Sequence, residues 1–172
     1  LSVIASANGG TSNATAVANS IINTGAGNDF IIIDANASSN NDWRWGRVGN
    51  AIGISSTDIS TGRDDDEIKV ASNGSTKSVA VKNSRIKSGS GSDYLEILSE
   101  SFNSENSNGV GKATGIVNSI INTEHGDDAL LIEVVGEAKA TGIQNSAINT
   151  GSSDDVIDII VEATNENDGV AI

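Results

Sequence analysis

The sequence predicts a parallel β-solenoid, an all-β fold (parallel β-helix) in which copies of one short unit stack as rungs. The first observation is a repeat: similar stretches occupy residues 19–35, 56–72, 83–99, 118–134 and 145–161. The second is that β-branched residues in each copy alternate with other residues, which is the period of a β-strand. The third is a Gly- and Asp-rich corner at the same place in every copy. We therefore expect each copy to form one rung of three short strands.

The spacing of the copies defines the rung. Rungs start near residues 14, 51, 78, 113, 140 and 169, in steps of 37, 27, 35, 27 and 29 residues. The minimal rung is therefore 27 residues long, and residues 1–172 hold five to six rungs in a single solenoid segment. Residues 1–5 match the last strand of a rung and residues 169–172 the first strand of another. We expect a piece of a longer array, or a unit that continues into another molecule.

Alternation within each strand predicts which side chains face the core. The expected inward residues of the first strand are Thr15 and Val17, Ile52 and Ile54, Val79 and Val81, Thr114 and Ile116, and Thr141 and Ile143. Those of the middle strand are Ile22, Ile59, Ile86, Ile121 and Ile148. Those of the third strand are Ile31 and Ile33, Ile68 and Val70, Leu95 and Ile97, Leu130 and Ile132, and Ile157 and Ile159. Rows of like aliphatic residues should stack at about 4.8 Å.

One position at the end of the first strand is nearly always asparagine. Asn19, Asn83, Asn118 and Asn145 share it, with Ser56 in the second rung. Asparagine is common in turns, so a structural role is the simplest interpretation, and the amides are expected to form a ladder along the axis.

Composition excludes several classes of function. The chain has no cysteine and one histidine, and its net charge is −13. A disulfide framework is therefore absent, and no nucleophile–base pair or phosphate-binding loop stands out. Such a charge disfavours nucleic acids and anionic membrane surfaces, and no apolar run approaches the ~20 residues needed to insert in a membrane.

The corner before the third strand concentrates negative charge. An aspartate closes it in all five rungs, and three rungs carry a second carboxylate just before; the residues are Asp29, Asp66, Asp93, Asp128 and Asp155, with Asp65, Asp127 and Asp154. Stacked at strand spacing, like charges repel by about 1 kcal/mol even in water. Two mechanisms could offset this: hydrogen bonds from turn N–H groups, or cations such as Ca²⁺.

The corner sequences GAGNDFIII and GSGSDYLEI, at residues 25–33 and 89–97, resemble the nonapeptide of RTX (repeats-in-toxin, haemolysin-type) proteins, which are large bacterial extracellular proteins. The resemblance implies Ca²⁺ as a cofactor, bound by Asp29, Asp66, Asp93, Asp128 and Asp155, and an extracellular or cell-surface location. This chain departs from the family because the nonapeptide occurs once per rung and lacks its first glycine. The glycine before x-Asp survives only at Gly27, Gly91 and Gly126.

Small residues alternate with the expected core residues of the first strand. They include Ala14, Ala16, Ala51, Gly53, Ala80, Ala113, Gly115, Ala140 and Gly142. If they face outward, they form a flat surface against which another solenoid can pack. The alternative is that small residues are needed for steric reasons in a crowded corner.

Two inserts, at residues 36–50 and 100–112, lie between the third strand of one rung and the first of the next. The first insert contains Trp43, Arg44, Trp45 and Arg47. Tryptophan and arginine are typical of contact sites, which suggests a glycan or protein partner. The alternative, which we favour, is that the rings cover the outward apolar residues of the third strand, namely Phe30, Ile32, Tyr94, Leu98 and Leu131.

These observations favour a non-catalytic structural segment of an extracellular or cell-surface protein, such as a filament, sheath, surface layer or adhesin rod. It is expected to associate with itself, end to end or side by side. The alternative functions are a polysaccharide-active β-helix enzyme and a glycan-binding module.

Overall fold

The computed structural model describes residues 1–9, 11–39, 48–102 and 111–164, which form sixteen β-strands in three parallel sheets. Sheet A consists of β1 (Ser2–Gly9), β4 (Phe30–Ser39), β7 (Glu67–Gly74), β10 (Tyr94–Ser101), β13 (Ala129–Gly136) and β16 (Val156–Ala163). Sheet B consists of β2 (Thr11–Ala18), β5 (Val48–Ser55), β8 (Lys77–Lys82), β11 (Lys112–Val117) and β14 (Lys139–Gln144). Sheet C consists of β3 (Ile21–Asn23), β6 (Asp58–Arg63), β9 (Arg85–Ser90), β12 (Ile120–Asn122) and β15 (Ala147–Asn149). The predicted parallel β-solenoid with three strands per rung is confirmed.

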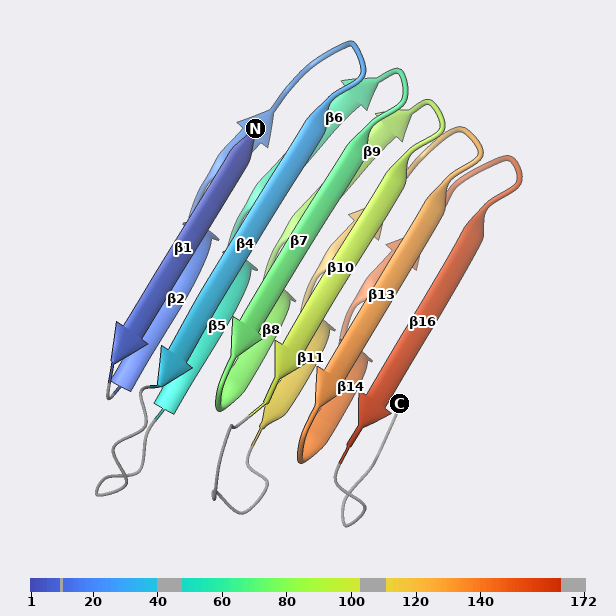
Figure 1. The fold of residues 1–172 in the computed structure, drawn as a ribbon. Helices are drawn as coiled ribbons and strands as arrows, with labels where there is room; N and C mark the ends of the chain where they lie inside the picture. The colour runs from blue at the N-terminus through green and yellow to red at the C-terminus, as the bar shows by residue number, and fades with distance from the viewer. Residues whose placement is uncertain (10, 40–47, 103–110, 165–172) are drawn as a thin grey trace.

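The rungs stack in the register of the repeat. Each strand of sheet A lies beside its equivalents in the neighbouring rungs, with β1 and β16 at opposite ends of the stack (Figure 1). Ala51 pairs with both Ala14 and Ser78, and Ala113 with both Ser78 and Ala140, so equivalent residues of successive rungs adjoin. In the part of the chain that the structure covers, no helix is long and apolar enough to cross a membrane.

The aliphatic core lies between the three sheets. The predicted inward residues of the third strand are buried in four rungs, and those of the middle strand in three; examples are Ile31, Ile97 and Ile121, each with no exposed surface. In the last rung Ile157 and Ile159 are 45% and 46% exposed, although their row neighbours Leu130 and Ile132 are at most 1% exposed.

The prediction for the first strand was half wrong. Val17, Ile54, Val81 and Ile116 do face the core, but so do the small residues expected outside. The small residues Ala14, Ala51, Gly53, Ala80, Ala113, Gly115, Ala140 and Gly142 are buried and Ala16 is partly buried. Of the residues predicted to face inward before the bend, Thr15 is exposed, Ile52, Thr114 and Thr141 are partly buried, and Val79 is buried as predicted. The flat outward face of small residues therefore does not exist.

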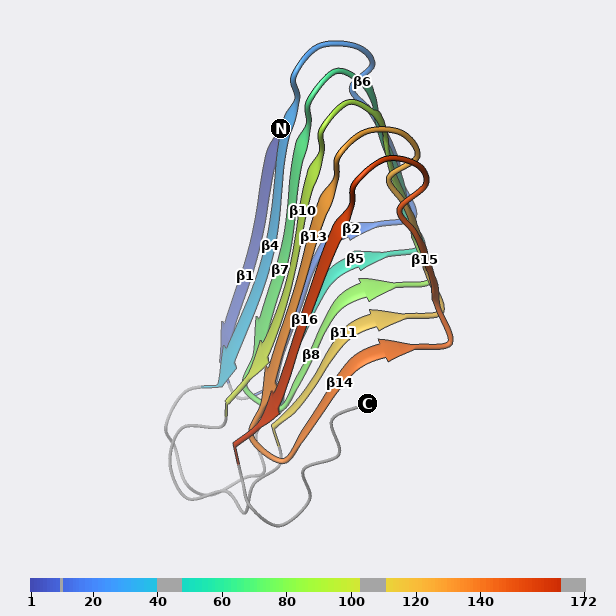
Figure 2. The same ribbon diagram turned by 90° about the vertical axis from the view of Figure 1, so that its right-hand side faces the viewer.

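A bend in sheet B explains the error. The pairing between neighbouring strands of sheet B is interrupted at one position, which is that of Ala16, Gly53, Ala80, Gly115 and Gly142. At this position two adjacent residues, such as Gly53 and Ile54, both face inward. Figure 2 shows that the strands of sheet B curve along their length, most clearly β8, β11 and β14. A strict period of two assumes a straight strand, so the bend reverses the assignment on its N-terminal side.

Close packing of sheet B on sheet A requires small residues at the bend. A Cβ atom on Gly53 would lie 2.6 Å from the Ala80 carbonyl oxygen and 2.8 Å from Val70 Cγ1. One on Gly115 would lie 2.8 Å from Val134 Cγ2. Ala14, Ala35, Ala37 and Ala51 form a further buried cluster between the sheets. The steric alternative for these small residues is thus the correct one.

The asparagine position at the end of sheet B strands has a left-handed backbone. Its φ angles are 51° at Asn19, 50° at Ser56, 48° at Asn83, 50° at Asn118 and 48° at Asn145. Asparagine tolerates this conformation better than other residues with a Cβ atom. One link of the expected amide ladder is present, since Asn118 Nδ2 donates to Asn83 Oδ1 at 3.3 Å.

Ser56→Asn should therefore stabilise the fold. We expect the free energy of unfolding to rise by about 0.5–1 kcal/mol, since asparagine relieves part of the left-handed strain. Chemical denaturation of the variant checks it, with Asn83→Ser as the reverse control. If both substitutions lower stability, backbone conformation does not explain the asparagine row.

Candidate functional site

The acidic corner links neighbouring rungs through the closing aspartates. The backbone N–H groups of the first four of these residues donate to the Oδ1 atom of the aspartate in the next rung. The N···O distances are 2.8 Å from Asp29 to Asp66, 2.9 Å from Asp66 to Asp93, 2.9 Å from Asp93 to Asp128 and 3.1 Å from Asp128 to Asp155. Backbone hydrogen bonds, one of the two mechanisms left open by the sequence, thus stabilise one oxygen of each acceptor carboxylate.

The second carboxylate oxygen of the column is buried without a partner. This holds for Oδ2 of Asp29, Asp66, Asp93 and Asp128. Asp66, Asp93 and Asp128 are at most 2% exposed. Burial raises the pKa of Asp93 above its usual value; hydrogen bonds from the Ser88 side chain and the Asp66 backbone oppose the shift, and the charges of Asp128 and Asp66 add to it. Burial therefore makes the charged form of this carboxylate less favourable than it is in water.

The outer carboxylates of the corner also accept hydrogen bonds from the backbone. Asp65 Oδ1 accepts from the Ser92 N–H at 2.8 Å, and Asp127 Oδ1 accepts from the Asp154 N–H at 3.1 Å. Asp65, Asp127 and Asp154 are exposed to solvent. Asp65 and Asp127 cap turns at the surface, and the three outer carboxylates do not converge with the buried column on a common point.

In the described part of the chain, the corner carboxylates are not gathered around one point as ligands of a metal ion. Ca²⁺ takes six to eight oxygen ligands, yet among the residues that the structure describes no group of three or more His, Cys, Asp or Glu side chains could hold a metal. In the carboxylates of Asp66, Asp93, Asp128 and Asp155, one oxygen already accepts a backbone N–H. The backbone carbonyls of the corner are also occupied, since those of Asp29, Asp66, Asp93 and Asp128 accept the N–H groups of Glu67, Tyr94, Ala129 and Val156, respectively. The ligation implied by the RTX resemblance is not reproduced here.

The glycines of the corner are explained by contact between rungs. Gly126 has a φ of 132°, and a Cβ atom there would lie 1.7 Å from the Gly91 carbonyl oxygen. At Gly62 and Gly151 the corresponding distances to carbonyl oxygens of the preceding rung are 1.8 Å and 1.7 Å. The turn needs glycine because successive backbones touch.

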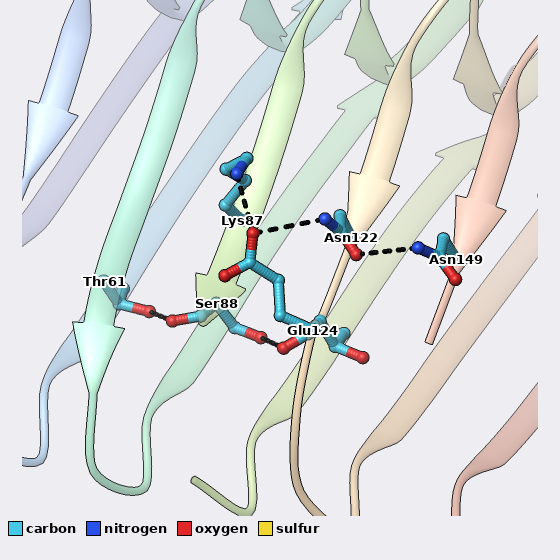
Figure 3. Close-up of polar contacts among 7 residues, drawn as sticks. Thr61, Lys87, Ser88, Asn122, Glu124 and Asn149 are labelled. Carbon is cyan, nitrogen blue, oxygen red and sulfur yellow. Dashed lines mark hydrogen bonds and ion pairs between the residues drawn. The ribbon is translucent and has the colours of Figure 1, made fainter. Parts of the chain in front are cut away.

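A hydroxyl ladder follows the middle strand, and the sequence reasoning missed it. Thr61 Oγ1 donates to the Ser88 carbonyl at 2.8 Å, and Thr123 Oγ1 donates to that of Thr150 at 2.9 Å. Figure 3 shows the Thr61–Ser88 contact between adjacent strands of sheet C. The signal was available, because Thr24, Thr61, Ser88, Thr123 and Thr150 occupy one position in the repeat.

Polar side chains on the outer face of sheet C also pair along the axis. Lys87 Nζ lies 2.6 Å from Glu124 Oε1, which also accepts from Asn122 Nδ2 at 3.3 Å (Figure 3). Asn149 Nδ2 donates to Asn122 Oδ1 at 3.2 Å. The single histidine, His125, contacts Ser152 in the next rung at 2.9 Å. Apart from the contact of Asn122 with Glu124, which lies within one rung, these contacts join neighbouring rungs, and the groups do not surround a common substrate position.

The predicted contact residues Trp43, Arg44, Trp45 and Arg47 lie outside the described residues, and so their role stays a prediction. The outward residues they were expected to cover do face away from the core. Phe30 is 46% exposed, and Ile32, Tyr94, Leu98 and Leu131 are partly exposed.

Comparison with known proteins gives no further assignment: no family model, no curated protein and no solved structure matches this chain.

Proposed function

We propose that this chain is a non-catalytic structural segment, a rod that is built by the stacking of rungs and associates with itself. The observation that carries the proposal is the arrangement of its polar side chains. Aspartates, hydroxyls and amides lie in rows that bind the next rung, as in the 2.9 Å contact of the Asp66 N–H with Asp93. Side chains arranged for catalysis would instead converge on one point.

The proposed location is extracellular or at the cell surface, in a bacterial filament, sheath, surface layer or adhesin rod. It rests on the resemblance of the corner sequences to RTX proteins. Calcium is not part of the proposal, since the corner carboxylates accept backbone hydrogen bonds instead.

Self-association is supported by the last sheet A strand. Ile157 and Ile159 are almost half exposed at positions that are buried one rung earlier. A further rung on β16, from this chain or from a second copy, would bury both side chains, at roughly 25 cal/mol per Å² of apolar surface removed from water. Strand addition along β16 would also extend the hydrogen-bonded ladder of sheet A.

Light scattering and electron microscopy of the protein, with Ca²⁺ and with a chelator, test the proposal. We expect concentration-dependent elongated particles and the same melting temperature in both solutions. An ion present at ~100 times its dissociation constant would raise the free energy of unfolding by about 2.7 kcal/mol. A higher melting temperature in Ca²⁺ would therefore show that the folded protein binds this ion.

A matched pair of variants examines the end contact. Ile159→Lys places a charge in the exposed core row and should shorten the particles, whereas Ala147→Lys, on the outer face of sheet C in the same rung, should leave them unchanged. A parent protein that stays monomeric at every concentration would contradict self-association.

A further inference from the structure

Sheet B presents a face without acidic residues. Its strands contain four lysines, Lys77, Lys82, Lys112 and Lys139, and neither Asp nor Glu. The strands of sheet A, by contrast, contain seven carboxylates and one lysine, and the whole chain has a net charge of −13. A positive face in so acidic a chain is a separate feature, because the stacking of rungs does not require it.

Three of these lysines form one row along the axis of the solenoid. Lys112 pairs in register with Lys77 on one side and with Lys139 on the other, and all three are exposed. In the two earlier rungs the same row holds Asn13 and Asn50, which are neutral. The row is therefore free of negative charge in all five rungs of sheet B.

The lysine row has no acidic partner within the described ranges, where none of its three members forms an ion pair. On sheet C the situation differs, since Arg85 and Lys87 each pair with an acid of a neighbouring rung. Like charges at the rung spacing of about 4.8 Å repel one another. A ligand that supplies anions at this spacing would relieve the repulsion.

Sheet A of a second copy does not supply such a row of anions. Glu133 and Asp158 lie on its neighbouring strands β13 and β16, but they pair in register with Ile160 and Leu131. Its acids therefore do not repeat from rung to rung as the lysines do.

Hydroxyl groups lie beside the lysines on the same face. Thr114 and Thr141 follow Lys112 and Lys139 by two residues, and side chains two apart in a strand point to the same side. The two threonines pair in register and are partly exposed. The strands of sheet B contain no aromatic residue, whereas proteins that bind single-stranded nucleic acids stack the bases on such residues. A row of ammonium groups beside hydroxyls suits an anionic sugar polymer instead.

We propose that the lysine row of sheet B binds a linear anionic polysaccharide that carries one carboxylate on each sugar and lies along the axis. In a 1,4-linked chain of this kind one sugar spans about the length of one rung, ~4.8 Å, so successive carboxylates meet successive lysines. The flexible lysine stems allow the ammonium groups to reach carboxylates on either edge of the polymer. This interaction goes beyond the proposed rod and does not depend on its self-association.

Binding of the whole chain to polygalacturonate, which has one carboxylate per sugar, tests the proposal. Isothermal titration calorimetry at about 0.1 M salt limits the influence of acids more than ~10 Å from the row, and a chelator prevents bridging by divalent cations. The matched control is the same polymer with its carboxylates methyl-esterified. We expect the acid to bind and the ester not to bind, and additional salt to weaken the binding of the acid.

Substitutions separate the lysine row from the total charge. The row variant replaces its three lysines by glutamine, with Lys77→Gln, Lys112→Gln and Lys139→Gln. The control variant removes as many positive charges from sheet C, with Arg63→Gln, Arg85→Gln and Lys87→Gln. The row variant should bind at least about tenfold more weakly than the parent, since three exposed ion pairs act together in one polymer. The control variant should bind within about threefold of the parent. Circular dichroism verifies folding, and Lys112→Gln alone replaces a row variant that does not fold.

The threonines test whether the ligand is recognised as a sugar. Thr114→Val with Thr141→Val keeps the shape and the charge of the face and removes two hydroxyl groups. We expect this variant to bind polygalacturonate severalfold more weakly, because its hydrogen bonds to the sugar hydroxyls are lost. Its binding to a single-stranded DNA of equal charge provides the comparison.

Four outcomes would overturn the inference. The first is an equal loss of affinity in the sheet C control, which would mean that only total charge matters. The second is equal binding of the methyl ester. The third is tighter binding of the DNA than of polygalacturonate, which would assign the row to nucleic acids. The fourth is a row variant that keeps its affinity for the polymer but loses self-association in light scattering, which would assign the row to a second copy. A monomeric parent that binds the polymer through this row would contradict the proposed function and support the inference.

Discussion

Gly126→Ala is expected to lower the free energy of unfolding by about 3 kcal/mol or more. The φ angle of 132° is a conformation that residues with a Cβ atom rarely adopt, at a cost of about 1–3 kcal/mol. The new Cβ atom would also lie 1.7 Å from the Gly91 carbonyl oxygen in the preceding rung. The Cβ atom is fixed to one backbone and the carbonyl oxygen belongs to the next, and the two backbones are closely stacked. The clash can therefore be relieved only by separating the rungs.

Gly25→Ala provides the matched control. Gly25 has a φ of 98°, yet a Cβ atom there would meet nothing within 4 Å. Both variants share the backbone strain, so the difference between them isolates the clash between rungs. Chemical denaturation measures both free energies. If both variants lose the same free energy of unfolding, the contact between rungs is not the reason that position 126 is glycine.

Asp93→Asn is expected to stabilise the protein at neutral pH, while Asp93→Ala destabilises it. The asparagine keeps an oxygen that accepts the Asp66 N–H at the position of the 2.9 Å bond, and it removes a buried charge. The alanine leaves that buried N–H without an acceptor, which costs about 1–3 kcal/mol. At this position the buried charge therefore lowers the stability of the fold, whereas the hydrogen bond raises it.

The pH dependence follows from the direction of the pKa shift. Burial raises the pKa of Asp93 in the folded state, so folding favours its protonated form. This stabilisation is fully present below the ordinary aspartate pKa of about 3.9 and is lost as the pH rises through the folded-state pKa. The advantage of Asp93→Asn over the parent should therefore grow from acidic to neutral pH.

Thermal melts of parent and variant over this pH range give the difference directly. Asp127→Asn is the control, because Asp127 accepts a backbone N–H in the same corner but is exposed. The comparison separates the effect of burying the carboxylate from the effect of losing a charge in this corner. An Asp93→Asn variant that is less stable than the parent at neutral pH would show that the buried carboxylate is stabilised by a group such as a cation.

The repeat of the sequence was sufficient to predict the fold and most of the core. Alternation over straight strands correctly assigned residues such as Ile33 and Ile97 to the interior. The recurrence of asparagine at one position predicted a turn, which the left-handed angle of 50° at Asn118 explains. These features depend on local chemistry and on the stacking of like on like, and a one-dimensional repeat contains both kinds of information.

The orientation of the first strand depended on the tertiary structure. The bend in sheet B brings Ala51 and Gly53 against sheet A, and no local pattern distinguishes a small residue facing outward from one facing a close neighbour. The role of the aspartates was likewise decided by distances between rungs, since the Asp93 N–H meets the Asp128 carboxylate 35 residues away. The spacing of the repeat placed the aspartates in one column. Only the distance between stacked rungs determines that the carboxylates of the later rungs, such as that of Asp128, accept a backbone N–H of the preceding rung.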